Sequence, residues 1–86
     1  MPKFRKKPIV IEARQYDGSY ESGVAISLWM AGGSATRHER VGDKIIVETY
    51  EGPLTASPGD WIIKGVQGEF YPFKPDIFEA TYEPAD

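Results

Sequence analysis

Short runs of alternating or continuous apolar residues, separated by glycine and proline, dominate the chain and predict a mainly β structure. The first run, residues 8–16 (PIVIEARQY), alternates well enough to form a strand. We expect its even-numbered face, which carries Val10, Glu12 and Arg14, to be solvated. The other face carries Ile9, Ile11 and Ala13.

A helix is predicted after the turn at Asp17-Gly18, because Ser19 or Ser22 can accept the hydrogen bond that caps a helix start. The apolar residues that fall on one helical face are Val24, Ala25, Leu28 and Trp29. Gly32-Gly33 is expected to end this helix, since glycine takes a left-handed cap without a Cβ penalty.

The middle of the chain predicts a β-hairpin in which residues 36–41 and 44–50 flank the tight-turn pair Gly42-Asp43. A second turn follows, and residues 54–56 form a short strand. Ser57-Pro58-Gly59-Asp60 is then a strong turn signal, because proline presets one dihedral angle and glycine supplies the positive one.

The C-terminal third predicts two more strands, residues 61–64 and 69–73, with Gly65 and Gly68 at the turn between them. Pro72 and Pro75 would interrupt a central strand, so the second of these strands should end at a sheet edge or in a loop. Pro75 suits the first position of a helical turn. We expect residues 80–83 to form a closing strand beside the first one.

At 86 residues the chain is one small domain, 1–86, in which residues 1–6 and 84–86 are expected to be flexible. It has no cysteine, so hydrophobic packing or a second subunit must stabilise it. The predicted fold class is α+β. We expect a small, strongly bent antiparallel sheet or partly open barrel, with one packed helix and a C-terminal helical turn.

Composition excludes several function classes. The net charge of −3 makes general nucleic-acid binding an unfavourable interpretation, because neutralising phosphates requires clustered Lys and Arg. No apolar run approaches the roughly 20 residues of a membrane helix, and the basic N-terminus lacks the apolar stretch of a secretory signal. Export by a secretory signal and a membrane partner are therefore not expected.

Motifs for catalysis are absent from the sequence, and we predict that the protein is not an enzyme. His38 is the one histidine and has no nucleophile motif near it. It lies in the run RHER, where Arg37, His38 and Arg40 could contact an anion such as a phosphate, although a solvated strand face explains them equally well.

The acidic residues of the second half show no metal-binding spacing, so neither a metal site nor a cofactor is expected. They are Asp60, Glu69, Asp76 and Glu79. A turn role for Asp60 and helix-start roles for Asp76 and Glu79 explain three of them.

Aromatic residues are dense in the second half of the chain: Trp61, Phe70, Tyr71, Phe73, Phe78 and Tyr82. Most are expected to form the core. Strand alternation nevertheless puts the neighbours Phe70 and Tyr71 on opposite faces of their sheet. At least one ring should therefore lie on a second surface, as a subunit or partner interface or as a stacking site for a flat ligand.

The string PGDWIIKGVQGEFYPFKPDIFEATYE, preceded by KKPIVIEARQY and a tryptophan-containing helix, resembles a family of short uncharacterised proteins of tailed phages and prophages. The resemblance covers nearly the whole chain. Members often have cysteine where this chain has Phe73, so a role tied to that thiol is absent here. The resemblance carries no catalytic residues; it implies a phage accessory protein acting in the cytoplasm of a bacterial host.

These observations together predict a non-enzymatic, homo-oligomeric binding protein that sequesters or blocks a host component. That component is a host protein or a small anionic ligand. One concrete form is a sponge for a nucleotide immune signal, in which Arg37, His38 and Arg40 hold phosphates while Tyr71 or Trp29 stacks on a base. A virion structural or assembly protein is the main alternative. A small hydrolase is a third.

Overall fold

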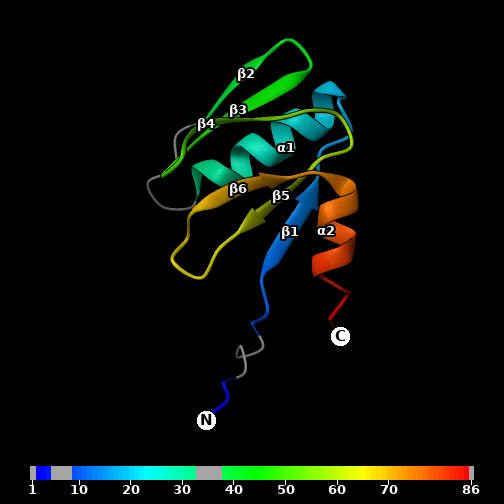
Figure 1. Cartoon of the computed structure of the whole chain (residues 1–86). Helices are drawn as coiled ribbons and strands as arrows, with labels where there is room; N and C mark the ends of the chain where they lie inside the picture. Colours follow the sequence, from blue (N-terminus) through cyan, green and yellow to red (C-terminus); the bar gives the residue numbers. More distant parts are fainter. Residues whose placement is uncertain (1, 5–8, 33–37, 86) are drawn as a thin grey trace.

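The computed structural model describes residues 2–4, 9–32 and 38–85, and all structural statements below refer to these ranges. It is an α+β fold with two separate antiparallel sheets of three strands each and two helices (Figure 1). Sheet A has the strand order β1-β5-β6 and sheet B the order β2-β3-β4. The predicted α+β class is confirmed, but the strands form two sheets instead of one bent sheet, and these sheets do not close into a barrel.

Strand bounds follow the turn signals of the sequence. Sheet A consists of β1 (Glu12–Gln15), β5 (Trp61–Lys64) and β6 (Phe70–Phe73), and sheet B of β2 (His38–Val41), β3 (Lys44–Thr49) and β4 (Gly52–Ala56). The predicted hairpin at Gly42-Asp43 is confirmed as β2–β3, with Gly42 at φ +63°. The predicted edge position of Pro72 is confirmed too, since β6 is an edge strand.

Helix α1 (Tyr20–Ala31) begins as expected at Ser19, whose hydroxyl accepts a hydrogen bond from the Ser22 amide at 3.1 Å. The helix ends at Gly32 as predicted, but Gly32 has φ −80° and is not left-handed, and Gly33 lies outside the described residues. The buried face also differs, because Gly23, Ile26 and Met30 are buried while Ala25 and Leu28 are exposed. Apolar residues line most of this helix, so periodicity alone selects no face.

Gly23 explains which face of α1 turns inward. A Cβ at this position would lie 3.2 Å from Nη1 of Arg40 and 3.6 Å from the Tyr16 ring. The missing side chain therefore lets β2 and the Tyr16 segment approach the helix closely. That approach buries Ile26, one turn further along.

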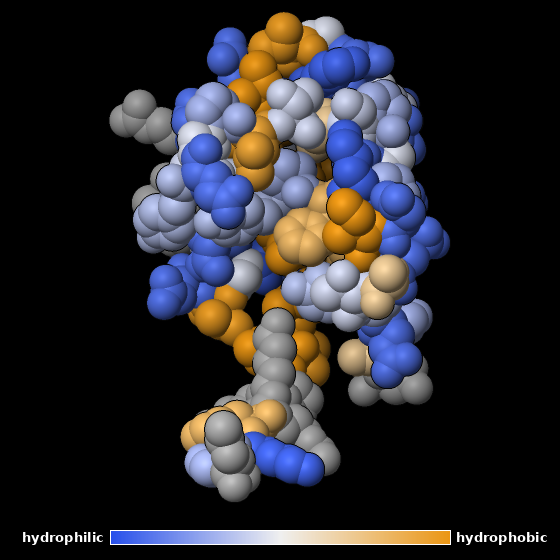
Figure 2. All heavy atoms as spheres, viewed as in Figure 1, coloured by the Kyte–Doolittle hydropathy of each residue, from blue (hydrophilic) through white to orange (hydrophobic). Residues whose placement is uncertain are grey.

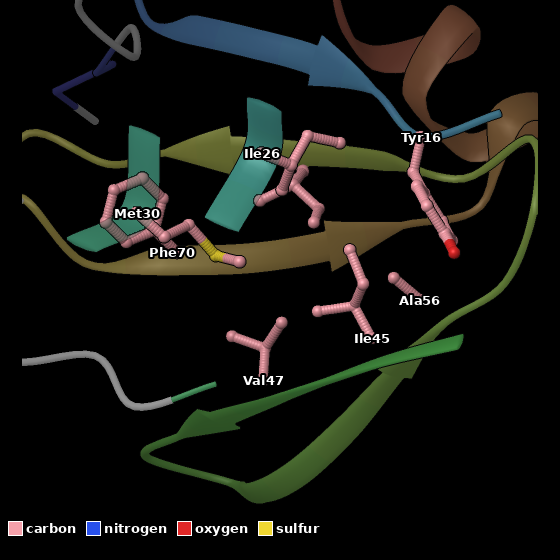
Figure 3. Close-up of a cluster of buried hydrophobic side chains, with 8 residues drawn as sticks. Tyr16, Ile26, Met30, Ile45, Val47, Ala56 and Phe70 are labelled. Carbon is pink, nitrogen blue, oxygen red and sulfur yellow. The ribbon is translucent and has the colours of Figure 1, made fainter. Parts of the chain in front are cut away.

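The core lies between the sheets, with α1 packed into it (Figure 3). Ile45 and Val47 of sheet B point toward Ile26 and Met30 of α1 and Phe70 of sheet A in Figure 3. The remaining members of the cluster are Tyr16, Ala56 and Ile62, with the half-buried Trp29 packed against it. Burial of these side chains is the main stabilising term, since each fully buried large side chain contributes about 1.5–3 kcal/mol.

The turn at residues 57–60 carries the chain from sheet B to sheet A. The buried Asp60 carboxylate accepts hydrogen bonds from the Ser57 amide at 2.8 Å and from Nζ of Lys74 at 2.9 Å. The Gly59 amide donates to the Tyr16 carbonyl, and the Tyr16 amide donates to the Asp60 carbonyl. The turn role predicted for Asp60 is confirmed, and this carboxylate also fixes the start of the α2 segment through Lys74.

Helix α2 (Pro75–Thr81) confirms the predicted helical turn with Pro75 in its first turn. It continues to Thr81, and β1 pairs with β5 alone, so the predicted closing strand at residues 80–83 is wrong. The Thr81 hydroxyl donates to the Ile77 carbonyl at 2.7 Å and so stays with the helix. Neither helix in the described ranges has the length and apolar character that crossing a bilayer requires.

Acid should weaken the entry to α1. Hydrogen bonds from the hydroxyl and the amide of Ser19 hold the pKa of Asp17 below its ordinary value of 3.8. A lowered folded-state pKa stabilises the protein above pH 3.8, and this contribution is lost as the pH falls through the folded value. In an NMR titration, the Ser19→Ala variant should show the pKa of Asp17 raised toward 3.8; an unchanged pKa would contradict the assignment.

Candidate functional site

The residues expected to hold an anionic ligand occupy different parts of the fold. Trp29 lies against the core, where its ring meets Phe70 edge-on at 5.1 Å between centroids. Tyr71 shares the opposite face of sheet A with Ile63, its neighbour across the strands. Sheet A therefore separates the two stacking candidates, and one base could not contact both.

Trp29 is already surrounded on its exposed side. Its Nε1 donates to Oε2 of Glu12 at 3.4 Å, and the Arg14 guanidinium lies 5.0 Å from the ring centroid. Glu12 and Arg14 are exposed, as predicted for the even-numbered face of β1. These two side chains also attach β1 to α1, a role that alternation alone could not indicate.

His38 and Arg40 lie on the same face of β2, opposite the buried residues Val47 and Ile45 of β3. Arg40 reaches across to α1, where its guanidinium lies 5.2 Å from the Tyr20 ring centroid. Arg40 is also exposed, so the alternative interpretation of a solvated strand face is supported for this residue. Arg37 lies outside the described residues.

A second aromatic surface, predicted from the alternation of Phe70 and Tyr71, is present on the outer face of sheet A. Phe70 is fully buried in the core, whereas Trp61 stacks on Phe78 of α2 with 4.3 Å between centroids and 7° between planes. Tyr82 continues the cluster, 5.3 Å from Phe78 and 6.1 Å from Phe73. The expectation that most of the six rings form the core is therefore wrong, because α2 provides a second place to pack them.

A groove runs beside this aromatic cluster at the end of the domain where both termini emerge. We call it the terminal groove. It contains two adjoining hollows of about 720 and 630 Å³ that share six lining residues, Ile9, Ile11, Tyr82, Glu83, Pro84 and Ala85. Apolar side chains gather at this lower end of the domain in Figure 2. The groove thus lies between the segment that leads into β1 and the segment that follows α2.

The two hollows differ in chemistry. The first hollow is completed by Ile63, Gly65, Val66, Glu69 and Thr81. The second is completed by Val10, Ala13, Trp61, Phe78 and Glu79. The first hollow therefore has mainly aliphatic walls and the second mainly aromatic and aliphatic ones, and each has two carboxylates in its lining, Glu83 together with Glu69 in the first or Glu79 in the second.

Glu69 is the buried carboxylate of the first hollow, which Thr81 and the exposed Glu83 also line. Its Oε2 is buried and has no hydrogen-bond partner. The other oxygen, Oε1, occupies the space where a Cβ at residue 65 would lie, so Gly65 is what admits the carboxylate. The backbone closes this arrangement, because the Gly65 amide donates to the Glu69 carbonyl at 2.7 Å. Sequence reasoning missed this role for Glu69, and the Gly65 to Glu69 spacing across a hairpin was the available signal.

No group of three or more His, Cys, Asp or Glu side chains in the described ranges is positioned to hold a metal ion. Comparisons of the chain with protein-family models, with curated proteins and with solved structures find no match.

Proposed function

We propose that the protein is a non-enzymatic phage accessory protein that binds and sequesters, or blocks, a host component in the bacterial cytoplasm. The observation that supports this proposal is the terminal groove, a hollowed and partly apolar surface beside an aromatic cluster that lies outside the core. Concave apolar surfaces with a few polar groups are where proteins bind ligands and partners. The phage setting comes from the sequence resemblance alone.

Exposed apolar residues around the groove strengthen the proposal. Ile9 is 51% exposed and Val10 is 81% exposed, although both line the groove. Apolar side chains gathered around a hollow are typical of a binding surface, whereas isolated ones carry no meaning. Partner binding would cover them.

The nucleotide-sponge form of the proposal receives less support from the geometry. Trp29 and Tyr71 are on opposite faces of sheet A, and Arg40 packs on Tyr20. The host component is therefore better assigned to the terminal groove than to the β2 face.

Replacing Ile9 with lysine should abolish capture of the host component, because a charge in both hollows would have to be desolvated on binding. The matched control is Val41→Lys, since Val41 is also 51% exposed but lies on β2. Native mass spectrometry of tagged protein recovered from infected cells measures the complex and identifies its components. Equal capture by both variants would contradict the proposal.

Mass spectrometry of purified virions distinguishes the proposed function from the main alternative, a virion structural or assembly protein. A sequestering protein should be absent or at trace level in washed particles. Stoichiometric abundance there would instead establish a virion structural or assembly role.

A further inference from the structure

The charge of the terminal groove specifies what it can bind. Its described lining includes three carboxylates, Glu69, Glu79 and Glu83, and no lysine, arginine or histidine. An anionic ligand would meet like charge along this surface, whereas a cation would be attracted. As far as its described residues go, the groove therefore favours a cationic ligand over the anionic one expected from the sequence.

Within the first hollow, Glu69 is the group best placed to bind a cation. A buried carboxylate oxygen without a partner is unfavourable, because it has lost its hydration and gained no hydrogen bond. A small rotation of the carboxyl group would direct its charge to a donor in the hollow, with which it would form a charge-assisted hydrogen bond. The aliphatic walls, Ile63 and Val66 among them, match the methylene stem of a lysine or arginine side chain.

The lining of the second hollow suits a different kind of side chain. Besides the exposed Glu79, the residues that line this hollow alone are Val10, Ala13, Trp61 and Phe78, and the last two stack on each other. An aliphatic side chain can pack against these surfaces without leaving a polar group unsatisfied. Two adjoining hollows, one for a long cation and one for an apolar group, suit two side chains of one extended peptide better than a single small amine.

We infer that the terminal groove binds an extended peptide segment of a partner protein, with a lysine or arginine side chain in the first hollow against Glu69 and an aliphatic side chain in the second hollow. This inference rests on the proposed function and names the chemistry of the bound component. Affinity comes from the apolar contacts, and Glu69 provides the preference for a cation.

The test uses the full chain labelled with ¹⁵N and titrated with capped heptapeptides. Each peptide carries one leucine and one lysine separated by one, two or three serines, and a matched set has norleucine in place of lysine. The best lysine peptide should bind about tenfold more tightly than its norleucine counterpart, as expected for a partly solvated hydrogen bond to a charged group.

The two tryptophans supply an internal control. The indole signal of Trp61 and the amide signal of Gly65 should shift on binding, because both residues line the groove. The indole signal of Trp29 should not, since that ring lies on the other side of sheet A and donates to Glu12. Shifts confined to Trp29 and its neighbours would overturn the assignment.

The variant Glu69→Gln keeps the side-chain shape and should remove the tenfold preference for lysine while leaving norleucine binding unchanged. Glu51→Gln makes the same charge change at an exposed turn of sheet B and should leave both affinities unaltered. Equal binding of lysine and norleucine peptides, or equal binding of free spermidine and the peptide, would overturn the inference. The proposed function would then still stand if capture in cells depends on Ile9.

Discussion

Replacing Phe70 with alanine should lower the free energy of unfolding by about 3–5 kcal/mol. Phe70 is fully buried, belongs to the cluster between the two sheets and meets Trp29 edge-on. Removal of the ring leaves a cavity, which only a rearrangement of α1 and both sheets could fill. Because small domains are stable by about 5–15 kcal/mol, much of the protein would be unfolded at moderate temperature.

Urea denaturation followed by circular dichroism measures this loss. The matched control is Tyr71→Ala, the adjacent residue on the outer face of the same strand, which is only half-buried. It should cost less than half as much. Equal losses for the two variants would mean that the outer cluster carries as much of the stability as the core.

The second large effect is expected at Gly18, which precedes α1. Gly18 has φ +89°, and a Cβ there would lie 2.8 Å from Cγ and 2.9 Å from Cβ of Pro58. The variant Gly18→Ala should therefore lose about 3 kcal/mol, because backbone strain and a clash with a rigid ring add together. The turn at residues 57–60 cannot easily move away from Gly18, since the Gly59 amide donates a hydrogen bond to the Tyr16 carbonyl.

Gly42→Ala is the comparison that isolates the clash. Gly42 has φ +63° in the β2–β3 turn, and a Cβ there would meet nothing within 4 Å. Its loss should be limited to the backbone term of about 1–2 kcal/mol. Thermal unfolding of the two variants measures the difference, and equal melting temperatures would show that Pro58 moves aside.

Local signals predicted the elements well because each has its own chemistry. Ser19 caps α1, Gly42-Asp43 turns the hairpin, and Pro75 begins α2. These residues act through dihedral angles and nearby hydrogen bonds, which the sequence specifies directly.

Features that depend on residues far apart in the sequence could not be predicted in the same way. The inward face of α1 depends on Gly23 meeting Arg40, and the end of α2 at Thr81 replaces a predicted strand. The division into two sheets follows from β5 pairing with β1 and β6 instead of β4. No local pattern encodes these partners, because strand pairing is set by which apolar faces meet.

The candidate site shows the same division. Alternation at Phe70 and Tyr71 predicted a second aromatic surface, and the structure has one. The residues expected to bind an anion do not lie together, because Trp29 and Tyr71 are on opposite faces of sheet A. Their side-chain chemistry alone does not indicate where the sheet places them. The burial of the Glu69 carboxylate was not predicted, because it depends on the missing side chain of Gly65 across the hairpin.

Each sheet margin in the described ranges carries a residue that discourages fibril growth. The outer strands β6 and β4 contain Pro72 and Pro53, which lack an amide hydrogen, while β1 and β2 bear charged side chains. Proline and charge at such positions oppose amyloid-like stacking of one molecule on the next. Edge-to-edge pairing of one copy with the next is therefore disfavoured at all four outer strands of the described ranges.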